Sequence, residues 1–167
     1  DWSSDVCSSD LEYIEKLPVV HKPQNTIVFD YVIPDNIEGW ADSIRELMIA
    51  LFSGSDVNFD YSQIRPEGAL IDGKFLAPGA EYLKESHNKI RWIMKNAGGR
   101  KLKSIEIHDI ICHIATCVVS GGVRRSAMIA LFDKDDELML KAKTGEWWNK
   151  NPQRAMANNS ILTTLDD

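Results

Sequence analysis

Three stretches of this chain place apolar residues at helical spacing, and short runs of β-branched residues alternate with them. The helical stretches are residues 36–52, 80–97 and 104–118. The runs that predict strands are residues 25–33, 127–132 and 160–165. A helix that connects two strands commonly crosses over the sheet and leaves the strands parallel. The order therefore predicts an α/β fold with a parallel sheet.

Each helical stretch has one apolar face that we expect to be buried. In the first stretch this face is Trp40, Ile44, Leu47, Met48 and Leu51. In the second it is Leu83, Ile90, Ile93, Met94 and Ala97. In the third it is Ile107, Ile110, Ile111, Ile114 and Val118.

Capping and turn residues set the limits of these elements. Asp35 or Asn36 is expected to cap the first helix and Ser104 the third, and Asp133 to begin a short acidic helix that runs to about residue 143. Residues 56–79 are rich in proline and glycine and predict an ordered loop.

Composition excludes several classes of protein. The chain has 167 residues, of which 44% are hydrophobic, and a net charge of −6, so a packed domain is expected rather than disorder. An acidic balance argues against DNA or RNA binding. No apolar run is long enough to span a membrane, and three cysteines are too few for a disulfide scaffold. These features favour a cytoplasmic protein.

Residues 1–11, DWSSDVCSSDL, have neither helical nor strand periodicity. They match, residue for residue, one reading frame of a widely used sequencing-adapter oligonucleotide. We hypothesise that they are translated adapter, disordered and joined to a gene that was cut at this point; the other end of the chain is suspected of being cut too. The alternative is a natural disordered N-terminus, and sequencing the locus from genomic DNA distinguishes the two.

Residues 120–126, SGGVRRS, are the most informative stretch for function. Two glycines let backbone N–H groups approach a ligand closely, and two arginines add planar forks suited to phosphate or to stacking on a base. The alternative is a plain glycine helix cap followed by a solvated charge pair, and the pattern alone leaves the two readings open. The spacing is not that of a Walker phosphate loop.

Two further stretches, residues 151–154 (NPQR) and 158–160 (NNS), precede the last strand. Their amides are able to bond a sugar or a base, although turn chemistry and strand capping are the simpler interpretation. Cys112 and Cys117 are five positions apart, a spacing that predicts different faces of the helix. We expect both to be buried small hydrophobic residues rather than metal ligands. For His21 and His87 we expect surface or capping roles.

Taken together, these segments resemble the large catalytic chain of ribonucleotide reductases, in particular the adenosylcobalamin-dependent (class II) ribonucleoside-triphosphate reductases. The likeness is strongest over residues 100–164, where SGGVRRSA, the Trp147–Trp148 pair, NPQR and NNS follow in the family's order. A weaker likeness covers residues 13–23, 35–52 and 59–68.

The resemblance implies a ten-stranded α/β barrel with an α+β insertion. Residues 12–25 and 99–167 are then barrel segments, and residues 26–98 are the insertion characteristic of cobalamin-dependent members. The family also implies a specificity loop that contacts both the ribonucleotide substrate and a deoxynucleotide effector. The residues matching that loop are Gly121, Gly122, Val123, Arg124, Arg125 and Ser126. Residues 71–79 resemble a second effector loop, which contains Gly73, Lys74, Ala77, Pro78 and Gly79.

The chemistry that the resemblance implies uses a cysteine thiyl radical generated with adenosylcobalamin, and a thioredoxin-type reductant for the full enzyme. The family's radical cysteine lies in an Asn-x-Cys-x-Glu motif, which this chain lacks. We therefore assign no catalytic and no metal-ligating residue here, and expect the chain alone to be inactive.

Rival interpretations remain open at this stage. One is a stand-alone nucleotide-sensing module, another is a structural or interaction domain, and a third is a fragment of an iron-dependent (class I) reductase.

Overall fold

The structure is a computed structural model that describes residues 5–8, 16–71, 73–118 and 128–163, with the backbone alone for residues 5–8. The helices are α2 (Ile37–Phe52), α3 (Glu81–Asn96), α4 (Ser104–Thr116), α5 (Glu137–Leu140), α6 (Trp147–Lys150) and the 3-10 helix η1 (Pro152–Met156). The strands are β1 (Asp5–Ser8), β2 (Ile27–Val32), β3 (Asp56–Asp60), β4 (Leu70–Ile71), β5 (Phe75–Leu76), β6 (Met128–Asp133) and β7 (Ala157–Leu162).

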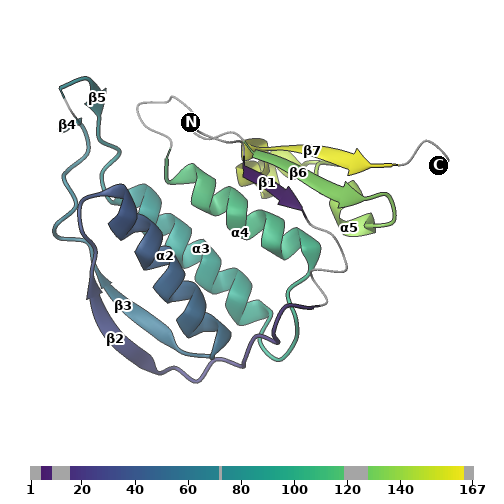
Figure 1. Cartoon of the computed structure of the whole chain (residues 1–167), viewed down its shortest axis with the longest axis horizontal. Coiled ribbons are helices and arrows are strands. Elements are labelled where there is room, and N and C mark those ends of the chain that lie inside the picture. The colour runs from purple at the N-terminus through teal and green to yellow at the C-terminus, as the bar shows by residue number, and fades with distance from the viewer. Residues whose placement is uncertain (1–4, 9–15, 72, 119–127, 164–167) are drawn as a thin grey trace.

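Helices α2, α3 and α4 lie side by side, with α3 in contact with both neighbours (Figure 1). The predicted inner faces of α2 and α3 are confirmed, since their members form the main core or pack against it and its neighbouring cluster. Asn36 caps α2 as predicted, because its Oδ1 accepts the Gly39 N–H at 2.7 Å. The predicted stripe of α4 divides: Ile110 joins the main core, whereas Ile111 packs on the opposite side with Cys112.

A two-stranded parallel sheet, β2 and β3, lies beside α2 and α3 (Figure 1). The predicted strand at residues 25–33 is confirmed as β2. The prediction of a loop throughout residues 56–79 is wrong, since this stretch contains β3 and the antiparallel hairpin β4–β5. The sequence DVNFD of β3 has little strand signal of its own, and its pairing with β2 supplies the order.

The second sheet has the order β1-β6-β7, with both pairs parallel. Parallel pairing in this sheet and in β2–β3 confirms the predicted α/β order, while the ten-stranded barrel stays a prediction. The expected disorder of residues 1–11 is wrong for Asp5–Ser8, which form β1 against β6. Strand pairing uses backbone groups, so an extended segment can pair with an open edge whatever its side chains. The adapter origin of these residues stays a hypothesis.

Three smaller predictions need correction. Ser104 is not the cap of α4; Lys103 stands at that position, and its N–H donates to Glu106 Oε2 at 2.8 Å. The acidic helix is only the four residues of α5, because Asp133 still belongs to β6 and Asp136 is the cap. The last strand begins at Ala157, three residues before the predicted start.

Candidate functional site

The predicted specificity loop is flanked by helix α4 and strand β6. Gly121, Gly122, Val123, Arg124, Arg125 and Ser126 all lie outside the described residues. The described chain stops at Val118, just after α4, and resumes at Met128, the first residue of β6. Helix α4 therefore precedes residues 119–127 and strand β6 follows them, and the contacts of α4 with the β6–β7 sheet define the surroundings of the candidate site.

An ion pair joins α4 to η1. Arg154 donates to both carboxylate oxygens of Asp109, at 2.7 Å from Nε to Oδ1 and 2.7 Å from Nη2 to Oδ2. Gln153 Nε2 donates to the same Oδ1 at 3.1 Å. Burial works to raise the pKa of Asp109, but the hydrogen bonds and charge of Arg154 outweigh it and hold this pKa at about 2. Both side chains of the NPQR stretch that reach α4 thus serve to connect helices, which supports the structural interpretation for them.

A second contact joins α4 to β7. The buried His108 ring lies with Nε2 3.2 Å from Asn159 Oδ1, and its Nδ1 is 3.7 Å from Cys112 Sγ. Cys112 itself packs against Met128 and Ala157 at the start of the two strands. Asn159, the middle residue of NNS, therefore forms part of the interface between β7 and α4.

The other two residues of NNS face the opposite way. Because side chains alternate along a strand, Asn158 and Ser160 point away from Asn159 and α4. Both are exposed. In the parallel register Asn158 stands beside Ile129, and Ser160 beside Leu131. This open face of the β6–β7 sheet consequently presents an amide and a hydroxyl next to apolar side chains, an arrangement suited to holding a small polar ligand.

The predicted burial of the two cysteines is confirmed. Cys112 and Cys117 are both buried, the first against β6 and β7 and the second against α3. Within the described ranges, no group of three or more His, Cys, Asp or Glu side chains is arranged to hold a metal ion.

The candidate effector loop at residues 71–79 is the end of the β4–β5 hairpin. Gly73 and Gly79 have φ values of +69° and +71°, in the left-handed region that glycine favours. Ala77 is buried and donates its N–H to the Ala69 carbonyl at 2.7 Å, whereas Lys74 is exposed. Pro78 lies between Ala77 and Gly79 at the base of the hairpin. The binding role of these five residues stays a prediction.

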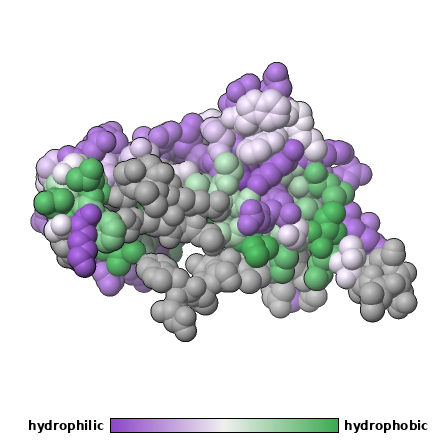
Figure 2. Space-filling view, turned by 90° about the horizontal axis from the view of Figure 1, so that it is seen from above, coloured by the Kyte–Doolittle hydropathy of each residue, from purple (hydrophilic) through white to green (hydrophobic). Residues whose placement is uncertain are grey.

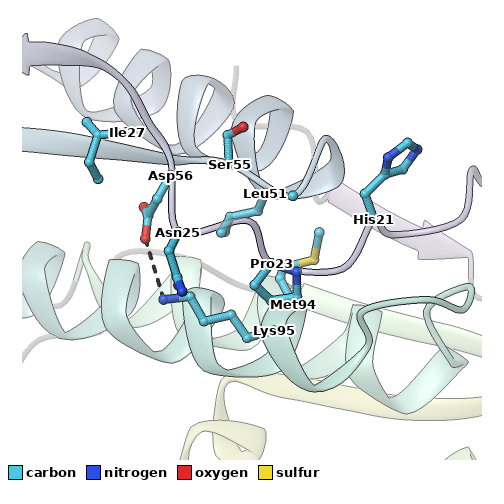
Figure 3. A pocket seen from close by; sticks show the side chains of 10 residues that line it. His21, Pro23, Asn25, Ile27, Leu51, Ser55, Asp56, Met94 and Lys95 are labelled. Atoms are coloured by element: carbon cyan, nitrogen blue, oxygen red, sulfur yellow. Dashed lines mark ion pairs between the residues drawn. The ribbon is translucent and has the colours of Figure 1, made fainter.

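A cleft of about 210 Å³ lies where residues 21–27 cross the C-terminal ends of α2 and α3 (Figure 3). Leu51 and Met94 give it an apolar floor, and an ion pair of 3.6 Å between Lys95 Nζ and Asp56 Oδ2 lies at its side. Gly54 permits the crossing, since its φ is +82° and a Cβ there would lie 2.4 Å from the Lys22 carbonyl oxygen. The expected surface position of His21 is confirmed, at the rim of this cleft.

The expected surface or capping role of His87 is wrong. Its ring is fully buried and stacked on Phe59, with Nδ1 2.7 Å from Tyr61 Oη and Nε2 3.1 Å from Ser43 Oγ. Ser43 Oγ donates to the Trp40 carbonyl, so it accepts from His87 Nε2, and Nδ1 is left to accept from Tyr61. Burial, together with the nearby charge of Arg91, lowers the pKa of His87 to about 3.

Hydrophobic side chains are exposed at both ends of the face that Figure 2 shows. Figure 2 shows hydrophobic surface at the end that carries the β4–β5 hairpin and at the opposite end, near β6 and β7. Exposed members are Leu70, Phe75, Leu76, Ile129, Ile161 and Leu162. Among the described residues, no helix combines the length and apolarity needed to cross a bilayer.

Comparison with known proteins gives one consistent result. No protein-family model matches. The chain is 36% identical over 141 residues to a probable adenosylcobalamin-dependent ribonucleoside-triphosphate reductase of Dictyostelium discoideum, and 37% identical over 145 residues to the corresponding reductase of Euglena gracilis. These alignments cover 81% and 82% of the chain, but only 18% and 19% of the relatives.

A solved structure agrees with the sequence relatives. A crystal structure of B-12 dependent (class II) ribonucleotide reductase matches with a TM-score of 0.69 and 25% identity, over 96% of this chain and 24% of that chain. The fold and the elements around residues 119–127 are thus homologous to one segment of the ribonucleotide reductases. Within that class, the relatives are the adenosylcobalamin-dependent ribonucleoside-triphosphate reductases, and this chain spans less than a fifth of their length.

Proposed function

We propose that this chain is part of an enzyme that reduces ribonucleoside triphosphates to 2′-deoxyribonucleotides with adenosylcobalamin, and that it carries the loop that senses substrate and effector. One observation carries the proposal: the sequence relatives and the structural neighbour belong to the same reductase class, and each is matched over a small part of its length.

The β6–β7 unit fits a barrel segment. Its strands are parallel, and α4 covers one face while the face with Asn158 and Ser160 stays open. In an α/β barrel the helices lie outside and the strand ends surround the ligand. In the complete ten-stranded barrel, residues 12–25 and 99–167 supply barrel segments and residues 26–98 the insertion. The open face then belongs to the interior.

The specificity loop is the binding element in this proposal. Arg124 and Arg125 contact the base or the phosphates of a nucleotide, and Gly121 and Gly122 allow the backbone to change shape with the effector. The hairpin with Lys74 is the second contact for the effector. One flexible element that two ligands bias is sufficient for allosteric selection of the substrate.

Adenosylcobalamin supplies the radical that starts the reaction when it is bound in the full enzyme. The cleft beside Lys95 does not fit it, because its volume of about 210 Å³ is smaller than the roughly 300–1,000 Å³ of ordinary ligand pockets, and a corrinoid needs more. In this proposal the cofactor site, the radical cysteine and the contact with a thioredoxin-type reductant belong to other parts of a cytoplasmic enzyme.

Nucleotide binding to this chain tests the proposal. Calorimetric titration with dATP, dGTP, dCTP and TTP is compared for the unchanged chain, Arg124→Ala and Arg125→Ala. Loss of a charge-assisted contact is expected to weaken binding about 10- to 100-fold. Arg45→Ala is the matched control, because Arg45 is an exposed arginine on α2. Equal binding with and without Arg124 and Arg125 would refute the loop's role, and deoxynucleotide formation by the chain alone would refute its inactivity.

A further inference from the structure

The last turn of α4 leaves one backbone carbonyl without its helical partner. In a regular helix the His113 carbonyl would accept the N–H of Cys117. Here the Cys117 N–H donates instead to the Ile114 carbonyl at 3.0 Å, which tightens the final turn. A helix end of this kind needs another donor for the free carbonyl, because an unpaired buried acceptor is costly.

Two hydroxyls satisfy the His113 carbonyl. One is Thr116 Oγ1 of α4 itself, at 2.6 Å, and the other is Ser86 Oγ of α3, at 2.5 Å. Both lone pairs of the carbonyl are thereby used. Ser86 is 27 residues away along the chain and its side chain is 1% exposed, so the end of α4 is held by a different helix through a part-buried hydrogen bond.

Ser86 also receives a hydrogen bond from the first residue after α4. Cys117 Sγ lies 3.0 Å from Ser86 Oγ, whose own proton is directed to the His113 carbonyl, so the thiol is the donor. Burial raises the pKa of Cys117 to about 11, which keeps the thiol proton in place at neutral pH. One hydroxyl of α3 thus contacts both the last turn of α4 and the chain that leaves it.

We propose that Ser86 is a positioning residue for nucleotide selection: its hydroxyl fixes the last turn of α4 and so sets where the chain enters residues 119–127. Ser86 lies in the 26–98 segment and α4 in the 99–167 segment, so this bond links the proposed insertion to the helix that precedes the specificity loop. The inference rests on the proposed function for the loop's role, but the cap itself can be tested separately.

The chain offers a close control in Ser43. This serine is also buried, at 0% exposed, and its hydroxyl likewise joins a backbone carbonyl and a side chain, those of Trp40 and His87. Those bonds lie on the α2 side of α3. Ser43→Ala therefore removes a buried hydroxyl of the same kind away from the end of α4.

Amide hydrogen exchange tests the cap without any ligand. In Ser86→Ala, the amides of Cys117 and Val118 are expected to exchange about tenfold faster than in the unchanged chain. Thr116→Val removes the second hydroxyl at nearly constant volume, so it is expected to act in the same direction, and Ser86→Thr to restore slow exchange. Ser43→Ala is expected to leave these two amides within about twofold of the unchanged chain. If Ser43→Ala accelerates them as much as Ser86→Ala does, or if neither Ser86→Ala nor Thr116→Val accelerates them, the cap is refuted.

Nucleotide titration then tests the positioning role. Ser86→Ala is expected to weaken the binding of dATP, dGTP, dCTP and TTP about fivefold. It is also expected to reduce the ratio between the dissociation constants of the weakest and the tightest binder among them. Ser43→Ala is expected to change neither the affinities nor this ratio. If Arg124→Ala abolishes binding but Ser86→Ala behaves like Ser43→Ala, the positioning role is wrong and the proposed function stands. If no nucleotide binds to the unchanged chain, the proposed function and the positioning role both fail, and hydrogen exchange alone decides whether the cap exists.

Discussion

The two halves of this chain differ in how much apolar core they contain, although each has a largely buried ion pair. In the first half, α2, α3 and the β2–β3 sheet enclose a continuous apolar core, and the buried polar group His87 is neutral and bonded on both nitrogens. In the second half, α4 shares this core through Ile110, whereas its contacts with the β6–β7 sheet rest on small apolar clusters. There the charged pair of Asp109 and Arg154 connects the elements.

In the proposed function, this difference separates a packed supporting region from the region that carries the specificity loop. In the second half, the long-range hydrogen bonds of Asp109 with Arg154 and of His108 with Asn159 add to the small apolar clusters in fixing the sheet against α4. The open face and the ends of the 119–127 segment both belong to the second half. Variants that remove packing should therefore act mainly on the first half, and variants that remove charge mainly on the second.

The largest effect is expected from Ile90→Ala. Ile90 of α3 is fully buried in the main core, so truncation leaves a cavity and should lower the free energy of unfolding by about 4 kcal/mol. Urea denaturation followed by circular dichroism measures the change. Ile49→Ala is the matched control, because Ile49 of α2 is exposed and its loss should cost less than about 0.5 kcal/mol. Equal losses would contradict the core assigned to this half.

The buried histidine predicts a pH dependence for the same half. His87 has a pKa of about 3 when folded and 6.5 when unfolded, so acid protonates the unfolded chain first. Stability from this residue is present above pH 6.5 and is lost as pH falls toward 3, by about 3 kcal/mol between pH 7 and 4. The groups facing the ring are Arg91, Asp56 and Tyr61.

His87→Gln isolates this contribution. Glutamine does not titrate, so the variant should be less stable than the unchanged chain at pH 7, and the difference between the two should shrink as pH falls to 4. Urea denaturation at half-unit pH steps gives the comparison. A difference that stays constant from pH 7 to 4 would show that His87 is not held neutral in the folded chain.

In the second half, Asp109→Asn tests the ion pair. Asp109 has a lowered pKa of about 2, so it stabilises the fold above its unfolded pKa of 3.8 and loses this contribution as pH falls toward 2. The variant should therefore cost about 2 kcal/mol at pH 7 and progressively less in acid. Asp42→Asn, at an exposed pair on α2, should change stability by less than about 0.5 kcal/mol. A cost that is independent of pH would contradict the charge-based role.

Helical periodicity predicted the first half well. The apolar spacing of α2 and α3 gave both their limits and their buried faces, because most of their packing is decided by which side of a helix a residue occupies. The same spacing also indicates that His87 is buried, because it lies four residues after Leu83 and three before Ile90, on the buried face of α3. Isolation in the sequence wrongly suggested a surface position.

The second half was harder to predict, since its contacts join distant residues. Nothing near Asp109 in the sequence indicates that Arg154, 45 positions later, is its partner. Strand β3 was missed for a related reason, because β2 supplies its order. The NNS stretch was found, but only the parallel register with β6 separates Asn159, bonded to His108, from Asn158 and Ser160 on the open face.

The smallest effect on stability, and the sharpest test of the open face, is expected from Asn158→Ala. Because Asn158 is exposed beside Ile129, its truncation should change the free energy of unfolding by less than about 0.5 kcal/mol. Asn159→Ala removes the partner of buried His108 one position away and should cost about 1–2 kcal/mol. If the open face holds a nucleotide, Asn158→Ala should weaken nucleotide binding more than Asn159→Ala does, although it leaves the stability unchanged. Calorimetry measures the binding of both variants. Two neighbouring asparagines with the same effect on both measurements would mean that the two faces of β7 do not differ in role.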